Sequence, residues 1–264
     1  MLLSDITPVI LTRNEASNIH RTLSQLAWAE DVVIVDSMSS DNTLEISRSF
    51  PQVRVFQREI DTLAGQWNYA ITRTGIRTPW ILALDADYFV PDEVVAELRN
   101  LQPEAVTMAY RARFKYCVCG KPLRRSLYPP VTMLFRKKYA EYRQDGHAHR
   151  VRIQGHIENL KNPVYHDDRK PLSVWIATQN RYMDLEAAKI ASTPWFSLGW
   201  SGRIRKLRLV APPLVFLYCL VVKGNLLDGW PGLYYASQRA LAESILSLRL
   251  LHLDLERRFD EYRT

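Results

Sequence analysis

Two aspartates at the end of an apolar run are the residues of this chain best suited to chemistry. Residues 80–84 are all apolar, and the run stops at Asp85-Ala86-Asp87. A run of this kind without a helical stripe predicts a strand buried on both faces, as in a parallel sheet. Such sheets bind ligands at the carboxyl ends of their strands, and two carboxylates there favour a hard divalent cation such as Mg²⁺ or Mn²⁺. The simpler alternative is a strand that ends in an Asp-rich turn.

Polar side chains follow three further predicted strands in the same way. Residues 6–11 and 31–35 have the character of buried strands, and residues 53–56 are predicted to form a third, short strand. The polar residues after them are Thr12, Arg13, Asn14 and Glu15, then Asp36 and Ser37, then Arg58 and Asp61. Gln66 and Asn68 come shortly before the strand at 80–84. Because the carboxyl ends of parallel strands meet at one edge of a sheet, we expect these side chains to converge.

The alternation of strands and helices predicts the fold class. Helices are expected over about 17–28, 44–50 and 65–73, with Asn14 or Ser17 capping the first. A series of this kind forms a parallel sheet with right-handed crossovers, so we expect an α/β protein. Further strands are expected at 106–114, 131–135 and 151–157, and further helices at 172–192 and 233–262.

Charge is distributed unevenly along the chain. The net charge is +7, but residues 1–100 hold 8 Arg, no Lys and 14 Asp+Glu, whereas residues 101–264 hold 27 Lys+Arg and 14 Asp+Glu. The acidic half suits metal binding, and the basic half suits an anionic partner such as a membrane surface or a nucleotide diphosphate. Three cysteines form no disulfide framework, which favours a reducing compartment. We expect no signal peptide, because the first residues run straight into a strand.

Four motifs in order along the chain resemble the family 2 glycosyltransferases with the GT-A fold. They are T-R-N-E-A-x-N-I from Thr12, V-V-I-V-D-S-M-S-S-D-N-T from Val32, Q-W-N-Y-A-I from Gln66 and L-A-L-D-A-D from Leu82. The chain looks most similar to the bacterial branch that contains lipopolysaccharide-core β-glucosyltransferases. The resemblance implies a mostly parallel sheet flanked by helices, a nucleotide-diphospho-sugar donor, with uridine favoured, and a divalent metal.

The resemblance also implies roles for individual residues. Asp87 is expected to bind the metal directly and Asp85 to face the ribose or the metal through water, with His166 as a further metal contact. The residues expected to bind the nucleotide-sugar are Thr12, Arg13, Asn14, Glu15, Asp36, Ser37, Arg58, Gln66, Asn68, Asp85, Ala86 and Asp87. Plain alternatives are that Asp36 only caps a loop and that Arg13 and Glu15 pair at the surface.

One departure from the family concerns the diphosphate. Many relatives carry a Lys or Arg near Gln66, where this chain has Trp67. Arg58 or a later cation is therefore expected to balance the diphosphate charge, and Arg169 and Lys170 are candidates. The alternative for the last two is an exposed charged turn before a helix.

An inverting transferase needs a base that takes the proton of the acceptor hydroxyl. In this family the base comes from a loop in the second half of the domain, and Asp145 is the candidate here. Relatives often continue with Val-His-Glu, whereas this chain continues with His147-Ala148-His149-Arg150. His147 and His149 are further candidates for substrate contact. The alternative is that Asp145-Gly146 forms only a turn.

The C-terminal part combines cations, a short apolar run and aromatic residues. Residues 203–208 hold four cations, residues 211–222 are apolar, and tryptophans and tyrosines lie on either side. The run is shorter than the roughly 20 residues that span a bilayer. An interfacial segment on an anionic leaflet is expected, with a buried helix as the alternative. The acceptor would then be a saccharide, or a lipid-linked one met at the cytoplasmic face of the inner membrane.

We expect three regions and consider two other functions. The regions are 1–100 for the nucleotide-sugar, 101–194 for the acceptor and 195–264 for the helical, membrane-facing extension. A nucleotidyltransferase usually has a glycine-rich phosphate loop after its first strand, but the first glycine here is Gly65. A non-catalytic basic binding protein would not explain the strand-end aspartates. No nucleic-acid-binding motif is found, so nucleic acid is not an expected partner.

Overall fold

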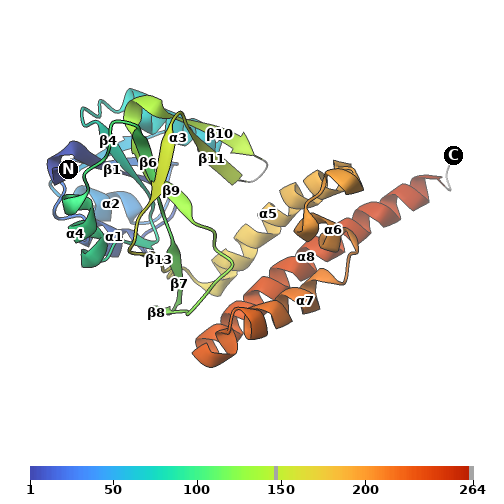
Figure 1. Ribbon diagram of the computed structural model, residues 1–264. Helices are drawn as coiled ribbons and strands as arrows, with labels where there is room; N and C mark the ends of the chain where they lie inside the picture. The colour runs from blue at the N-terminus through green and yellow to red at the C-terminus, as the bar shows by residue number, and fades with distance from the viewer. Residues whose placement is uncertain (146–147, 262–264) are drawn as a thin grey trace. The chain divides into compact units, whose positions relative to one another are not determined.

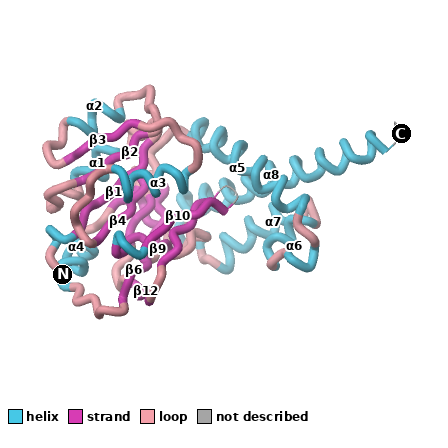
Figure 2. The backbone as a smooth tube through the Cα atoms, turned by 90° about the horizontal axis from the view of Figure 1, so that it is seen from above, coloured by secondary structure: helices cyan, strands magenta, loops and turns pink. Residues whose placement is uncertain are grey.

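The computed structural model describes residues 1–145 and 148–261, with side chains described except at 145–149 and 260–261. The chain divides into two compact units. Unit 1 is Met1–Pro122 with Tyr128–Lys170, and unit 2 is Leu123–Leu127 with Pro171–Thr264. Figure 2 shows strands and short helices in unit 1 and longer helices in unit 2.

Unit 1 is built on a seven-stranded mixed sheet (Figure 1). Its strands, in spatial order, are β12 (His156–Asn159), β6 (Thr107–Ala112), β9 (Val131–Arg136), β4 (Trp80–Asp85), β1 (Ile6–Thr12), β2 (Val32–Asp36) and β3 (Val53–Gln57). Strands β4, β1, β2 and β3 pair in parallel, whereas β9 pairs antiparallel with β4 and β6. The predicted α/β class with a mostly parallel sheet is therefore confirmed.

Both faces of the sheet carry apolar cores, because successive side chains of a strand point to opposite faces. The helices of unit 1 are α1 (Ile19–Ser24), α2 (Thr43–Arg48), α3 (Leu63–Arg73) and α4 (Asp92–Asn100). Ile34 and Leu82 belong to one core, with side chains of α1 and α4. Val33 and Ile81 belong to the other, with side chains of α3. Burial on both faces explains why these strands are continuously apolar rather than alternating.

The first helix is shorter than its sequence pattern predicts. A helix was expected over 17–28, but α1 covers only Ile19–Ser24. The N–H of Leu26 donates to the carbonyl oxygen of Leu23 at 2.9 Å, an i→i+3 bond that tightens the chain after the helix. Leu26 is nevertheless fully buried, so its apolar spacing reflects core packing rather than a further helical turn.

Two smaller sheets complete unit 1. The four-stranded one has the order β5 (Tyr88–Phe89), β13 (Val164–His166), β7 (Phe114–Val118) and β8 (Lys121–Pro122). The other is a hairpin of β10 (Ala140–Asp145) and β11 (Ala148–Ile153). Two short 3-10 helices are η1 (Leu3–Asp5) and η2 (Lys137–Tyr139). Antiparallel pairing of β13 with β5 sets His166 opposite Tyr88, one residue beyond Asp87.

Unit 2 is helical. Its elements are α5 (Leu172–Ser192), η3 (Trp195–Ser197), α6 (Trp200–Lys206), α7 (Ala211–Leu217), η4 (Tyr218–Val222), η5 (Asn225–Asp228) and α8 (Trp230–Glu261). The helix predicted at 172–192 is confirmed, and the one predicted from 233 begins three residues earlier, at Trp230. Ala187 and Ile190 of α5 form an apolar cluster with Leu246 and Leu250 of α8. Within 1–145 and 148–261, none of the helices has the length and apolar character that a membrane crossing needs.

Shortening a central core side chain is expected to destabilise unit 1. Leu82 lies in β4 between β1 and β9 and is fully buried. Leu82→Ala should lower the free energy of unfolding by about 2–5 kcal/mol, because it removes apolar contacts and leaves a cavity. Guanidinium titration followed by circular dichroism measures this. Leu2→Ala, at a residue that is 69% exposed, is the matched control, and equal losses in both variants would contradict the assignment of the core.

Candidate functional site

The strand ends that carry the predicted polar residues lie next to one another. In the parallel register, Thr12 of β1 is opposite Asp36 of β2, and Leu11 is opposite Asp85 of β4. The order β4-β1-β2-β3 therefore places the residues that follow these strands along one edge of the sheet (Figure 1). This edge is where parallel sheets bind ligands.

Asp36 organises the loop that follows β2. Its Oδ2 accepts from Thr12 Oγ1 at 2.8 Å and from Ser39 Oγ at 2.5 Å, and its Oδ1 accepts from the N–H of Ser39 at 2.8 Å. Asp36 is fully buried. Its carboxylate therefore joins two strand ends and a loop, as a cap does, and a ligand would have to reach it through this loop.

The turn after β1 is joined to the same loop. Asn14 has a left-handed backbone (φ 55°), a conformation that Asn tolerates better than most residues. Its N–H donates to Ser39 Oγ at 2.8 Å, and its Oδ1 accepts from the N–H of Ser40 at 2.9 Å. Arg13 is exposed. The two loops that are expected to hold the nucleotide are thus one hydrogen-bonded structure.

Arg58 and Gln66 connect the ends of β2 and β3 to α3. Nη1 and Nη2 of Arg58 donate to the two carboxylate oxygens of Asp61, at 2.9 and 2.8 Å, and Nη1 also donates to Gln66 Oε1 at 2.9 Å. Gln66 Nε2 donates to Ser37 Oγ at 3.0 Å. Hydrogen bonding to Arg58 lowers the pKa of Asp61 to about 2. Arg58 is thus already paired with a carboxylate at the place where it was expected to balance a diphosphate.

Asn68 and Trp67 contact the hairpin rather than the strand-end loops. Asn68 Nδ2 donates to the carbonyl of Tyr142, and Asn68 Oδ1 accepts from the Tyr142 N–H, both at 2.9 Å. Trp67 is 2% exposed, and its ring stacks on that of Tyr142 with centroids 5.0 Å apart. The residue that replaces the family's cation is therefore a core side chain that fixes β10 against α3.

Asp85-Ala86-Asp87 follows β4 and is held by backbone contacts. The carbonyl of Ala86 accepts from Thr22 Oγ1 at 2.6 Å, and the carbonyl of Asp87 accepts from the N–H of Asp167 at 3.0 Å. Asp85 is the last residue of β4 and is partly buried. The geometry therefore keeps both carboxylates at the sheet edge.

Asp87 and His166 form a close, largely buried pair. Asp87 Oδ2 lies 3.1 Å from His166 Nε2, and their side chains are 16% and 14% exposed. Burial disfavours charge on both groups, yet their mutual attraction outweighs it. The pKa of Asp87 is therefore lowered and that of His166 is raised. Asp87 Oδ1 and His166 Nδ1 are both buried without a hydrogen-bond partner. Buried polar atoms without a hydrogen-bond partner are rare in proteins, so these two make the pair a candidate for ligand binding.

Three tyrosines surround the His166 ring. Tyr128 stacks on it at 4.8 Å, and Tyr116 and Tyr88 lie at 4.9 and 5.7 Å between centroids. The hydroxyls of Tyr88 and Tyr128 are hydrogen-bonded at 2.7 Å. The packing fixes the plane of the imidazole beside Asp87.

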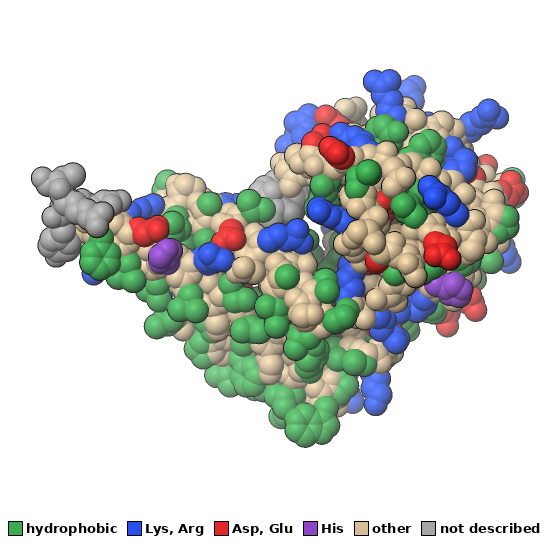
Figure 3. Space-filling view, turned by 180° about the vertical axis from the view of Figure 1, so that it is seen from behind, with side chains coloured by type: hydrophobic (Ala, Val, Ile, Leu, Met, Phe, Trp, Pro, Cys, Tyr) green, Lys and Arg blue, Asp and Glu red, His purple; other side chains and the backbone are tan. Residues whose placement is uncertain are grey.

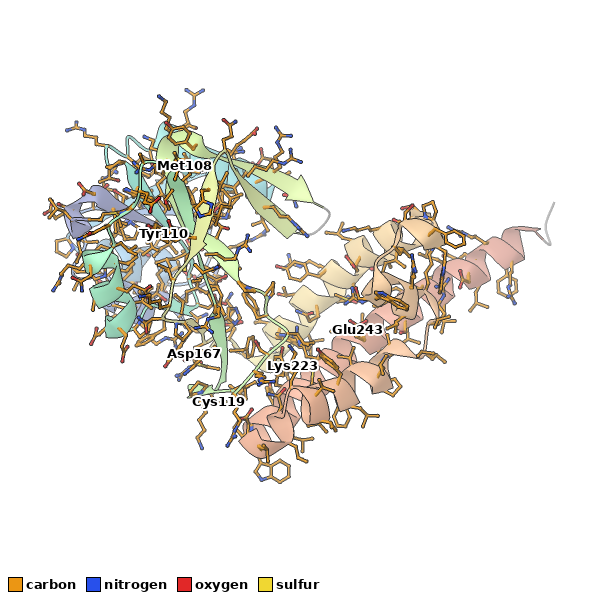
Figure 4. The ribbon with its side chains drawn as sticks, in the orientation of Figure 1. Met108, Tyr110, Cys119, Asp167, Lys223 and Glu243 are labelled. Atoms are coloured by element: carbon orange, nitrogen blue, oxygen red, sulfur yellow. The ribbon has the colours of Figure 1, made fainter. Side chains whose placement is uncertain are left out.

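A second polar cluster follows β13. Asp167 is paired with Arg169 at 2.8 Å and with Arg21 at 3.5 Å, and its Oδ1 accepts from the N–H of Gly120. Figure 4 labels Asp167 close to Cys119. Lys170 is paired with Glu15. The two cations considered for the diphosphate are thus both paired with carboxylates.

Glu15 lies in this cluster and not in a surface pair with Arg13. Its N–H donates to Thr43 Oγ1 at 2.7 Å, and its Oε2 accepts from Asn18 Nδ2 at 3.0 Å. Burial raises the pKa of Glu15 to about 7, against the opposing attraction of Lys170. Asn18 also donates to Asp168 at 2.9 Å, so it joins the β1 turn to the chain after β13.

The candidate base stays a prediction. Asp145 is the last residue of β10, paired in the hairpin with Ala148, but its side chain lies outside the described part of the chain. The same holds for His147 and for the side chain of His149. Among the residues that the structure describes, no three His, Cys, Asp or Glu side chains form a metal-binding group. The side chains at this edge that could contribute to binding a metal are those of Asp85, Asp87 and His166.

Sequence reasoning did not identify Asn18, Arg21 or the tyrosines around His166. Asn18 is part of the first motif, which assigns it no role of its own, and Arg21 is only a polar position of an amphipathic helix. Tyr128 lies in a loop 38 residues before His166, and no local pattern connects the two. Their contacts exist only because β13 pairs with β5 and β7.

Comparison with known proteins gives a family match over most of unit 1. The sequence model of the family described as Glycosyl transferase family 2 matches residues 7–157. An uncharacterized glycosyltransferase of Rickettsia bellii (strain RML369-C) is 28% identical over 148 residues. That match covers 54% of this chain and 49% of the relative, so the chain spans about half the length of this relative.

Similar solved structures are distant in sequence. TarS 1-349 of S. aureus, in complex with UDP-GlcNAc, is 14% identical, with a TM-score of 0.47 over 96% of this chain and 91% of that chain. Glucosyl-3-phosphoglycerate synthase of Mycobacterium tuberculosis, in complex with Mn²⁺, UDP and glucosyl-3-phosphoglycerate, is 13% identical, with a TM-score of 0.43 over 70% and 78%. At this distance the roles of residues rest on the contacts of this chain itself.

The raised pKa of Glu15 predicts a pH-dependent stability. The group binds its proton more tightly in the folded chain than in the unfolded one, so its contribution is full below pH 4.5 and is lost as the pH rises through about 7. Glu15→Gln should therefore remove on the order of 1–2 kcal/mol of the stability change between pH 5 and pH 8. Denaturant titrations at both pH values measure this. The exposed Glu45→Gln is the control, and an unchanged pH profile in Glu15→Gln would refute the expectation.

Proposed function

We propose, since the chain belongs to glycosyl transferase family 2, that it transfers a sugar from a nucleotide-diphospho-sugar to a saccharide acceptor with inversion. The predicted membership in this family is confirmed by the match over residues 7–157. The observation that carries the proposal is the edge where β1, β2 and β4 end, with Thr12, Asp36 and Asp85 in adjacent register. A nucleotide and its diphosphate need such an edge, because backbone groups and acidic side chains are presented there together.

The donor proposed is a UDP-sugar. A carboxylate offers about four lone-pair sites, and three hydrogen bonds to Asp36 leave one that can accept the imide N–H of uracil. Because Asp36 is fully buried, uracil binding requires the loop at 37–42 to move. The loop is held by hydrogen bonds to Asn14, Ala16, Gln66 and Asp36 itself, so exposing the carboxylate requires several of them to break.

The residues at the end of β4 fit a divalent metal. The orphaned Oδ1 of Asp87 is a hard oxygen donor, and His166 adds an imidazole that the tyrosines hold in place. Asp85 lies at the end of the same strand. We propose that these three residues hold Mg²⁺ or Mn²⁺. When bound, the ion would neutralise the charge that develops on the leaving diphosphate.

The acceptor reaction needs a base on the other side of the sugar. We propose that Asp145 takes the proton of the acceptor hydroxyl as that oxygen attacks the anomeric carbon. Asp145 ends β10, which Asn68 and Trp67 fix against α3. The acceptor proposed is a lipid-linked or cell-envelope saccharide, reached at the cytoplasmic face of the inner membrane; this finer part rests on the composition of the C-terminal helices.

Removing the charge of Asp87 is expected to abolish the metal-dependent reaction. Asp87→Asn should lower Mn²⁺-dependent hydrolysis of UDP-sugars, or transfer from them, by about 100-fold or more. The substitution removes the charge that would bind the ion and that pairs with His166. A panel of UDP-sugars with and without chelator measures this, and thermal shift with UDP and Mn²⁺ gives a readout independent of turnover. Asp92→Asn, at an exposed position, is the control. Full turnover of Asp87→Asn in excess chelator would rule out the proposed metal site.

Replacing Asp145 should affect chemistry more than donor binding. Asp145→Asn is expected to lower kcat about 100-fold to 10,000-fold, as for other general bases, while UDP binding stays nearly unchanged. Steady-state kinetics and UDP titration separate the two effects. Glu141→Gln lies on the same strand, exposed and paired with Arg143, and should leave both unchanged. Activity of Asp145→Asn equal to that of the parent would remove this residue from the mechanism.

A further inference from the structure

We propose that one edge of unit 2 binds the surface of an anionic membrane by inserting apolar and aromatic side chains between its headgroups. This edge, called the apolar edge below, consists of exposed residues of α7, η4, η5 and the start of α8. Its members are Leu214, Leu217, Tyr218, Val221, Leu227 and Trp230. The inference extends the proposed lipid-linked acceptor, but vesicle binding is measured without any sugar, so the two can fail separately.

The segment 211–222 has two apolar stripes and only one of them is covered. Ala211 and Cys219 are buried, and α7 packs on α8. Leu214, Leu217, Tyr218 and Val221 follow the spacing i, i+3, i+4, i+7 and are all exposed. A helix covered on one side normally turns polar residues to water on the other. This one is apolar on both sides, which indicates a second apolar environment for the exposed stripe.

The exposed stripe continues into neighbouring elements. Val221 is 71% exposed, Leu227 69% and Trp230 82%. Figure 3 shows hydrophobic side chains gathered along the part of unit 2 that carries α7 and the start of α8. Trp200, on α6, is also exposed. The area is too extended to be the scattered exposure of single apolar residues.

The charges around the apolar edge select an anionic partner. Arg205 and Arg208 are paired with Glu243 and Asp254, so these cations hold the helices of unit 2 together. Arg203 and Lys223 form no ion pair with any described residue; instead they lie over exposed aromatic rings. Arg203 is 5.8 Å from the ring of Trp200, and Lys223, labelled in Figure 4, is 5.6 Å from that of Tyr218. In an anionic leaflet the cations would contact the lipid phosphates, and the aromatic rings would lie just below them at the glycerol groups.

Asp228 is the only acidic residue of the sequence between 194 and 235, and it forms an ion pair within unit 2. Asp228 pairs with Arg124 at 3.5 Å and accepts from Asn225 at 3.1 Å, so its charge is used within unit 2. A two-fold contact with a second copy would bring the cations of both copies into one interface, where like charges repel each other. A phosphate-bearing surface has no such repulsion and is the better match.

The dimensions place the segment in the plane of the membrane and not across it. Twelve residues, 211–222, extend about 18 Å as a helix, against a hydrocarbon core of about 30 Å. After Lys223 comes Gly224, whose left-handed backbone (φ 72°) ends the helical segment. Side chains on one face can therefore enter the headgroup region while the opposite face stays packed on α8.

Vesicle binding by the full chain tests this inference. Wild-type protein should sediment with vesicles of phosphatidylcholine containing about one third phosphatidylglycerol and bind pure phosphatidylcholine more weakly. Leu217→Glu/Val221→Glu should weaken binding about tenfold or more, because two carboxylates enter an apolar, anionic contact. Leu2→Glu/Val106→Glu makes the same changes at residues of similar exposure in unit 1 and should bind like wild type. Circular dichroism checks that both variants are folded.

A second measurement does not depend on those variants. Brominated lipids should quench the tryptophan fluorescence of bound wild-type protein, and Trp200→Ala/Trp230→Ala should lose most of that quenching. Absence of binding to anionic vesicles at low salt would overturn the proposal, as would equal weakening by both glutamate pairs. A dimer in light scattering that Leu217→Glu/Val221→Glu converts to monomer, without vesicle binding, would assign the edge to a second copy instead and also overturn it.

Discussion

The largely buried pair of Asp87 and His166 is the contact on which the arrangement of the candidate site depends. A carboxylate in this position is strongly unfavourable unless a cation or hydrogen-bond donors compensate it. His166 supplies that compensation only because β13 pairs antiparallel with β5, directly after Asp87. The tyrosines then fix the imidazole ring, and the N–H of Asp167 holds the backbone of Asp87. The four-stranded sheet β5-β13-β7-β8 therefore carries the histidine that balances the charge of Asp87.

The same balance explains why one oxygen of Asp87 remains without a partner. His166 contacts Oδ2 of the carboxylate, whereas Oδ1 is buried and makes no hydrogen bond to a described residue. By contrast, Asp36 has both oxygens occupied by Thr12 and Ser39. The two aspartates thus differ: both oxygens of Asp36 bind protein groups, so a ligand reaches it only after its loop moves, whereas Asp87 keeps one oxygen without a hydrogen bond.

Local patterns sufficed for the strands and their ends, but not for contacts made through tertiary pairing. Apolar runs predicted β1, β2 and β4, the short stretch 53–56 predicted β3, and parallel pairing followed from the alternation of strands with helices. Gln66 and Asn68 stay predicted nucleotide contacts, but no local pattern indicates that Asn68 and Trp67 also bind the hairpin at Tyr142. The pairing of Lys170 with Glu15 joins residues 155 positions apart, which no local spacing reveals. The helix after β1 is shorter than predicted. Leu26 has the spacing of a helical core residue and is buried, but it lies in the turn that follows the helix.

The excess of cations in the second half of the chain does not by itself identify a partner. Several of these cations form ion pairs within unit 2, where Arg205 contacts both Glu243 and Glu186, and Arg208 contacts Asp254. These pairs are partly buried and link α6 and its C-terminal end to α5 and α8, so their role is structural. The cations without an ion pair to a described residue include Arg203 and Lys223, which lie beside exposed aromatic rings. What distinguishes this surface is therefore not its net charge but the coincidence of unpaired cations with an uncovered apolar stripe, a combination that water alone does not stabilise.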